Sequence, residues 1–258
     1  MFAETFAKQG CLVIDRLFDP RLIEAAYDEY ARQYSAFDPA NLPLHLEVGD
    51  KRLHLPLQLR GPLLNPEIYA HPILITILAN ILKTAFLIDS VNCVTALPGA
   101  EAQRFHRDHP SLFDEQDGLA ASLPAYAVTV AIPLMDLTPE TGATELFAGS
   151  VGSAGNVEGP DTYVEAIRPF VARGGCFLMD YRLWHRGMAN RSERDRPILY
   201  ITYAREWFTD VANFRKHSRM MIDREDARRI PAEHRALFRR AAAQGLHDLS
   251  VKEWLALD

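Results

Sequence analysis

A run of short β-type segments fills the chain from Phe86 to Glu206, and it restricts the fold more than any other feature of the sequence. Within Ala125–Leu134, apolar β-branched residues recur at every second position, which is the period of a strand. Turns that contain glycine or proline separate the segments. Several short strands at this spacing predict an antiparallel barrel or jelly roll. The expected strands are Phe86–Leu97, Ala125–Leu134, Thr144–Phe147, Ala166–Phe170, Cys176–Met179 and Ile198–Glu206.

Helical periodicity marks the region before this run. Asp19 caps a predicted helix that begins at Pro20, and apolar residues at helical spacing continue to Tyr34. Another helix begins at Pro72 and is apolar on nearly all sides, so we expect it to be buried. Short strands are expected at Cys11–Ile14 and around 53–59.

The pattern returns to helix after the last expected strand. Pro231 begins a predicted helix that continues through Ala243 and that Gly245 ends. This end of the chain is locally basic, but acidic residues are interspersed, so a solvated helical face or a contact in a homodimer is favoured over a polyanion site. The basic residues are Arg228, Arg229, Arg235, Arg239 and Arg240.

These observations predict a single domain over residues 1–258. A helical N-terminal part would occupy residues 1–85, the β core about 86–206, and a helical C-terminal extension 207–258. A chain of 258 residues is within the range of one barrel or sandwich domain, and neither an internal repeat nor a low-complexity linker divides it.

A His-x-Asp pair follows the first long strand. On an extended segment His106 and Asp108 project to the same side, so that one metal ion could receive an imidazole nitrogen and a carboxylate oxygen. His185 lies several expected strands downstream and would complete a set of two histidines and one carboxylate. That ligand set, with open positions on the metal, is typical of non-heme Fe(II) oxygenases.

Arg196 begins the strand after His185 and could point into the same cavity. Its guanidinium is suited to a two-point grip on a carboxylate. A non-redox metalloenzyme of the cupin type could use the same three ligands, but it needs no such arginine. A catalytically silent barrel that acts as a binding protein needs none of the four residues.

Composition excludes other classes of function. The net charge is −6 and the pI is about 5.9, which gives no electrostatic reason to bind nucleic acid. Three widely spaced cysteines argue against a disulfide framework and for a reducing compartment, so a cytoplasmic location is expected. The N-terminus lacks the pattern of a signal peptide, and the apolar run from Ile73 to Leu82 is too short to span a bilayer.

Taken together, these motifs resemble the phytanoyl-CoA dioxygenase (PhyH) family. The resemblance covers roughly residues 90–206 and the opening from Phe2 to Tyr34. It implies a mainly β fold, in which N- and C-terminal helices flank a double-stranded β-helix core of the jelly-roll or cupin-like type. The matching motifs are His106-x-Asp108, Thr141-Gly142-Ala143-Thr144, and Asp180-x-Arg182-x-x-His185-x-Gly187-x-x-Asn190 followed by Arg196.

The resemblance also implies roles for particular residues. His106, Asp108 and His185 would hold Fe(II), and Arg196 would bind the distal carboxylate of the cosubstrate 2-oxoglutarate. Gln103 and Thr144 occupy positions that contact 2-oxoglutarate in some members, and are carried over on that basis. Two turns depart from the family pattern, at Ala148-Gly149-Ser150-Val151 and at Gly175-Cys176, and neither departure removes a metal ligand.

The expected activity is that of an Fe(II)- and 2-oxoglutarate-dependent dioxygenase that uses O2. Its substrate would be a small organic molecule, such as a secondary metabolite or an amino-acid or lipid derivative, and no membrane or nucleic-acid partner is expected. The reaction would be hydroxylation, desaturation or rearrangement. Related enzymes that install chloride have a small residue in place of the carboxylate ligand, so Asp108 favours oxidation over halogenation.

Overall fold

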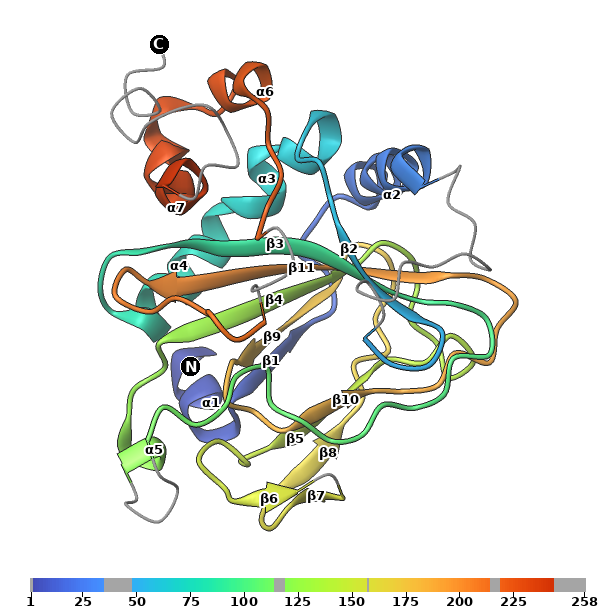
Figure 1. Cartoon of the computed structure of the whole chain (residues 1–258), viewed down its shortest axis with the longest axis vertical. Helices are drawn as coiled ribbons and strands as arrows, with labels where there is room; N and C mark the ends of the chain where they lie inside the picture. Colours follow the sequence, from blue (N-terminus) through green and yellow to red (C-terminus); the bar gives the residue numbers. More distant parts are fainter. Residues whose placement is uncertain (1, 35–47, 114–118, 157, 214–218, 244–258) are drawn as a thin grey trace.

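Two antiparallel β-sheets form the centre of the molecule (Figure 1). The structure is a computed structural model that describes residues 2–34, 48–113, 119–156, 158–213 and 219–243. In the main sheet the order is β1 (Cys11–Ile14), β9 (Cys176–Asp180), β4 (Ala127–Pro133), β11 (Arg196–Arg205), β3 (Phe86–Ala96) and β2 (Arg52–Pro56). The smaller sheet has the order β10 (His185–Gly187), β5 (Thr144–Ala148) and β8 (Glu165–Ile167), and a short hairpin joins β6 (Gly155–Asn156) to β7 (Gly159–Pro160).

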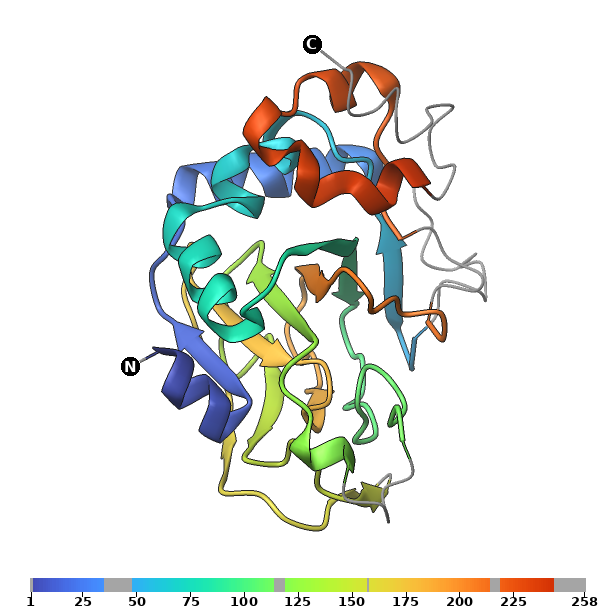
Figure 2. The same cartoon turned by 90° about the vertical axis from the view of Figure 1, so that its left-hand side faces the viewer.

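The two faces of the main sheet have different neighbours, because side chains alternate along each strand. On β4, Val128 and Val130 join a large apolar cluster with the helices, whereas Ala131 joins a second cluster with residues of the smaller sheet such as Leu146. Helices accordingly lie on one side of the main sheet and the smaller sheet lies on the other (Figures 1 and 2). These helices include α2 (Pro20–Tyr34), α3 (Pro66–Tyr69), α4 (Pro72–Leu82) and α7 (Arg239–Ala243). This mainly β jelly-roll arrangement with peripheral helices confirms the predicted fold class.

The N-terminal part supplies helices and also the two edge strands of the main sheet, β1 and β2. At the start of α2 the predicted cap is present, since the Asp19 carboxylate accepts a hydrogen bond from the backbone N–H of Arg21 at 2.9 Å. The remaining helices before and between the strands are α1 (Phe2–Gln9), a 3₁₀ helix (Gly61–Leu64) and α5 (Leu119–Ser122).

Helix α4 is buried on one side only, which corrects the expectation of a helix buried all round. Ile73 is 53% exposed, and Thr76 and Asn80 are also on the exposed side, so that the helix presents polar groups to solvent there. The buried stripe consists of leucines and isoleucines at helical spacing, namely Leu74, Ile77, Leu78, Ile81 and Leu82. In the described part of the chain, the structure contains no helix that is both long and apolar enough to cross a membrane.

The C-terminal part differs from the predicted single helix. It forms α6 (Arg224–Arg228), a 3₁₀ helix (Ala232–Phe238) and the short α7. Phe238 is fully buried and packs edge-on against Tyr69 with ring centroids 4.9 Å apart, so this region is attached to α3 by packing. Gly245, the predicted end of the helix, lies outside the described residues.

Arg240 corrects the expectation that the basic residues of this region face solvent or another subunit. It is buried and pairs with Asp89, which also accepts a hydrogen bond from Arg219 at 2.7 Å. The register of β11 and β3 shifts at this point, because Thr202 pairs with Ser90 and the next residue pairs two positions further along β3. Asp89 is the extra residue of this β-bulge, and bulges redirect side chains in this way.

Candidate active site

The His-x-Asp segment runs beside β10, and this pairing brings the two predicted histidines together. His106 and His185 exchange both backbone hydrogen bonds, at 3.0 Å and 2.9 Å, in an antiparallel bridge. β10 in turn pairs with β5, where His185 is opposite Leu146. The histidines therefore come from neighbouring extended segments, and their rings lie 4.4 Å apart between centroids.

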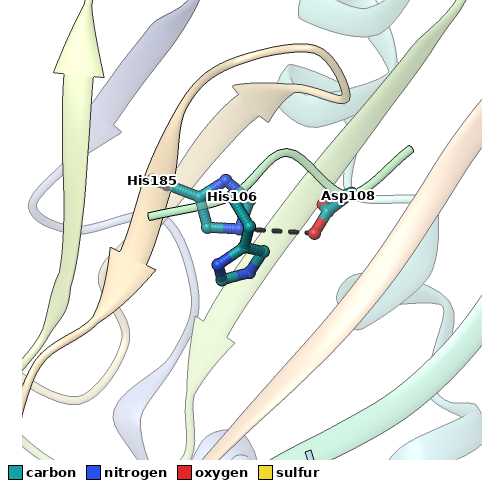
Figure 3. A group of neighbouring side chains, drawn as sticks. All are labelled: His106, Asp108 and His185. Carbon is teal, nitrogen blue, oxygen red and sulfur yellow. Dashed lines mark ion pairs between the residues drawn. The ribbon is translucent and has the colours of Figure 1, made fainter. Parts of the chain in front are cut away.

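Asp108 completes a compact group of three side chains (Figure 3). His106, Asp108 and His185 each offer one ligand atom, and all these atoms lie within 4.8 Å of one another. Nε2 of His185 is 3.3 Å from Oδ1 of Asp108. Two imidazole nitrogens and a carboxylate oxygen at this spacing could hold one divalent metal ion on three sides.

Both imidazoles are oriented by backbone carbonyl groups. Nδ1 of His106 is 2.9 Å from the carbonyl oxygen of Arg104, and Nδ1 of His185 is 2.9 Å from that of Leu183. A carbonyl can only accept, so each Nδ1 carries the hydrogen and each Nε2 keeps a lone pair for a metal. This outer support is the usual arrangement of metal-binding histidines.

The electrostatics of the group differ between the two histidines. Burial, assisted by the neighbouring His185, lowers the pKa of His106 to about 4. Burial also disfavours the charged form of His185, but Asp108 outweighs it and raises the pKa of His185. For Asp108, burial is again the largest effect and would raise the pKa, yet the histidines together hold that pKa below its usual value.

Arg196 is buried at the first position of β11 and lies in the same cavity. Its Nη1 donates to the carbonyl oxygens of Thr141, Ala143 and Met188 at 3.3–3.4 Å, while its Nε has no partner among the described residues. Burial, and next the charge of Arg52, lower the pKa of Arg196 to about 10. No carboxylate of the described residues forms an ion pair with this guanidinium.

Gln103 and Thr144 also line the cavity. The side chain of Gln103 connects two backbone segments, because its Nε2 donates to the carbonyl of Val48 at 2.9 Å and its Oε1 accepts from the N–H of Gly187 at 3.0 Å. Thr144 Oγ1 is 3.2 Å from the hydroxyl of Tyr200. The structure thus brings all six predicted site residues to one cavity.

Arg52 and His54 belong to this cavity too, and no sequence motif marks them. Arg52 is 1% exposed, and its Nη2 donates to the carbonyls of Glu101 and Met188 while its Nε has no partner among the described residues. The alternation of apolar and polar residues along β2 is the sequence signal that could have predicted their position. Leu53 and Leu55 face the apolar core, so that Arg52 and His54 must face the other side of the sheet.

The cavity has a volume of about 770 Å³, and strands of both sheets line it. Arg52 and Arg196 are close enough that the charge of the first lowers the pKa of the second. The three possible metal ligands lie along its wall. The space is in the range of sites that enclose a small molecule.

A jelly roll that carries two histidines and one carboxylate beside a cavity has the ligand set that is typical of a non-heme iron oxygenase. Residues 6–198 match the model of the phytanoyl-CoA dioxygenase (PhyH) family, and the chain belongs to that family. The resemblance inferred from the motifs is thereby confirmed. The protein is an oxidoreductase of the dioxygenase type, and iron and 2-oxoglutarate are the cofactors of this class.

Individual relatives agree with this assignment. The chain is 26% identical over 230 residues to Dioxygenase trt7 of Aspergillus terreus, a match that covers 86% of this chain and 78% of the relative. Among solved structures, HygX from Streptomyces hygroscopicus with nickel, 2-oxoglutarate and hygromycin B bound has a TM-score of 0.57 at 17% identity, covering 83% of this chain and 93% of HygX. The epimerase SnoN in complex with Fe3+, alpha ketoglutarate and nogalamycin RO has a TM-score of 0.55 at 16% identity, covering 79% and 82%. These structural likenesses concern the fold.

Proposed function

We propose that this protein couples the oxidation of 2-oxoglutarate to the oxidation of a C–H bond in a small organic substrate. Hydroxylation is the reaction that we favour, with desaturation and rearrangement as other outcomes of the same chemistry. One observation supports the proposal most directly. The ligand group His106, Asp108 and His185 shares a cavity with Arg196, a buried guanidinium that has no carboxylate partner among the described residues.

The side chains fit an iron ion. Each histidine has its Nδ1 hydrogen engaged by a backbone carbonyl, which leaves Nε2 as the ligand atom, and Asp108 adds a negative oxygen. When bound, iron with 2-oxoglutarate and O2 supplies the oxidising power for an unactivated C–H bond, and 2-oxoglutarate leaves as succinate and CO2. Asp108 would supply the carboxylate ligand that chloride-installing enzymes lack, which favours oxidation over halogenation.

Arg196 is suited to hold the distal carboxylate of 2-oxoglutarate. Its Nη1 is fixed by three carbonyl oxygens, and its unpaired Nε remains available for a bond to that carboxylate. Arg52 adds positive charge nearby and likewise has an unpaired Nε among the described residues. Thr144 would donate a hydroxyl hydrogen bond, and Gln103 would orient the backbone around the cosubstrate.

A small-molecule substrate agrees with the size of the cavity and with the ligands bound in similar solved structures. HygX and SnoN were solved with hygromycin B and nogalamycin RO bound, and both of these ligands are small molecules. A cavity of about 770 Å³ is large enough for 2-oxoglutarate together with a small organic substrate. A homodimer and a cytoplasmic location remain predictions of the sequence.

The test is anaerobic reconstitution with Fe(II), followed by calorimetry with 2-oxoglutarate and a succinate assay after oxygen is admitted with candidate substrates. We expect 2-oxoglutarate to bind only when metal is present, and succinate release to rise with a true substrate. Metal binding without any affinity for 2-oxoglutarate would instead indicate the non-redox metalloenzyme. Failure to bind either would indicate a silent barrel.

A further inference from the structure

One wall of the cavity is a row of uncharged polar side chains on the inner face of the main sheet. Ser90 of β3 pairs with Thr202 of β11, and Thr202 pairs with Thr129 of β4. Partners in an antiparallel pair point to the same side, so the three hydroxyl groups form a line across three strands. All three residues line the cavity, and we call them the hydroxyl row.

The hydroxyl row has hydrogen-bonding capacity that the described residues do not use. Ser90 is 1% exposed, and its Oγ has no partner among the described residues. Thr129 and Thr202 have their Oγ1 atoms 3.3 Å apart, and a single bond between two hydroxyls leaves one hydrogen and several lone pairs free. Asn92, at the next inward position of β3, lines the cavity without a side-chain hydrogen bond to the described residues.

A buried hydroxyl without a partner destabilises the folded state, because it loses its hydrogen bonds to water. This cost is offset when a ligand supplies the missing partner. The position of Ser90 therefore indicates that a polar group of a ligand binds at the row.

Two buried carboxylates near the row, Asp89 and Asp210, already have partners. Asp89, the neighbour of Ser90 at the bulge, is bonded to Arg219 and Arg240. Tyr181 donates its hydroxyl to Asp210 at 2.5 Å. An ionised substrate group placed at the row would lose its hydration, and the row itself offers no opposite charge to replace it. A neutral hydroxyl or carbonyl group would instead meet hydroxyl groups that can donate or accept a hydrogen bond.

The row also lies away from the cosubstrate end of the cavity. Thr202 is six residues beyond Arg196 on β11, a separation of roughly 20 Å along an extended strand. Tyr200 lies between them, and the charges of both Arg196 and Asp108 act on its pKa, which burial raises. A molecule at the row would thus lie away from the side chain that is assigned to the cosubstrate carboxylate.

We propose that the hydroxyl row is a substrate subsite that selects an uncharged molecule bearing hydroxyl or carbonyl groups. This inference rests on the proposed function, since it assigns Arg196 to 2-oxoglutarate. It names the substrate class by chemistry: neutral and oxygenated at the end that meets Ser90, Thr129 and Thr202.

Matched probes test the proposal on protein loaded with Ni(II), a redox-inert stand-in for iron, and saturated with 2-oxoglutarate. The probes are cyclohexanol, cyclohexanone, cyclohexylammonium and cyclohexanecarboxylate, titrated by ligand-observed NMR. We expect the two neutral probes to bind more tightly than the two charged ones. Preference for a charged probe, or no binding of either neutral probe up to its solubility limit, would overturn the assignment.

Variants locate the binding at the row. Ser90→Ala and Thr202→Val should each weaken cyclohexanol binding by roughly five- to tenfold, the effect of one lost hydrogen bond, without changing 2-oxoglutarate affinity. Ser90→Ala should not lower the melting temperature, because it removes a hydroxyl that has no partner among the described residues of the free protein. Thr95→Val is the matched control, since Thr95 is on the same strand but bonds to Tyr30 at 2.8 Å on the helix-covered side.

The outcomes separate the two proposals. If the wild-type, metal-loaded protein does not bind 2-oxoglutarate, the proposed function fails. If it binds 2-oxoglutarate but Ser90→Ala and Thr202→Val bind cyclohexanol as the wild type does, only the assignment of the hydroxyl row is wrong. Loss of cyclohexanol binding in Thr95→Val to the same degree would also count against it.

Discussion

Nε2 of His185 lies 3.3 Å from Oδ1 of Asp108, although the two residues are on separate segments of the chain. The backbone bridge between His106 and His185 produces this contact, because it aligns the His-x-Asp segment with β10. Without a metal, the contact partly compensates for the burial of the carboxylate. A metal ion would replace it with stronger bonds to both atoms.

Asp108→Ala tests this arrangement. The change removes the only anionic group of the three-residue set, so we expect the affinity for Ni(II) or Co(II) to fall by more than roughly a hundredfold, beyond the losses that outer-shell changes cause. Calorimetric titration of the metal-free protein measures it. His71→Asn is a suitable control, since His71 caps α4 at a distance from the site and asparagine preserves the cap. Unchanged metal affinity in Asp108→Ala would contradict the assigned ligand set.

Arg196→Lys tests the cosubstrate grip. Lysine keeps the charge but cannot form two parallel bonds to a carboxylate, so the affinity for 2-oxoglutarate should fall by roughly tenfold or more. The metal affinity should stay nearly the same, because Arg196 is not among the ligand atoms. Both are measured by calorimetry on the same preparation. Arg173→Lys, at a partly exposed arginine that pairs with Glu24, should leave both affinities unchanged. Parallel loss of metal and 2-oxoglutarate affinity would refute the role.

Asp89→Ala tests the bulge that attaches the C-terminal part. Asp89 is fully buried between Arg219 and Arg240, and its removal leaves two buried guanidinium groups without their carboxylate. We expect the free energy of unfolding to fall by about 3–5 kcal/mol in urea titrations. Glu225→Ala breaks a pair between exposed side chains and should cost at most about 0.5 kcal/mol. A similar, small effect of both variants would show that the buried cluster does not stabilise the fold.

The three cysteines predict a dependence of stability on alkaline pH. Burial raises the pKa of Cys11, Cys93 and Cys176 to about 12 each, from a value of 9.0. The unfolded chain therefore loses protons before the folded one as pH rises from 9, and the free energy of unfolding should fall by up to about 1.4 kcal/mol per pH unit for each thiol. Denaturant titrations at several pH values measure this slope, and a triple Cys→Ala variant should show a shallower one. Native protein near neutral pH should also resist thiol alkylation, and rapid labelling would contradict the burial.

The grouping of His106, Asp108 and His185 was predictable because their order and spacing along the chain form a motif. Arg52 has no such motif, and only the pairing of β2 with β3 brings it beside Arg196. The hydroxyl row was equally hidden, since its members come from three strands and meet through sheet register. Sequence pattern locates strands, but register decides which side chains share a wall.

In the C-terminal part, the sequence pattern led to a wrong expectation about burial. The basic residues there were expected to face solvent because arginine usually does. Arg240 is buried instead, and its partner is 151 residues away on β3. A one-residue bulge creates that partner by turning Asp89 out of the regular alternation, and the local sequence of β3 contains no glycine or proline that would reveal it.

Gly142→Ala tests the link between a backbone turn and the cosubstrate site. Gly142 has φ +75°, and a Cβ atom there would clash with the carbonyl oxygen of Ala189 and lie 2.9 Å from Nη1 of Arg196. The left-handed conformation should cost about 1–2 kcal/mol of stability, and the displaced guanidinium should lower 2-oxoglutarate affinity roughly tenfold. Gly61→Ala separates the two effects, because Gly61 has φ +51° with open space around its Cβ position. It should lose stability, as Gly142→Ala does, but keep its affinity for 2-oxoglutarate. Equal affinities in the two variants would show that Gly142 does not set the position of Arg196.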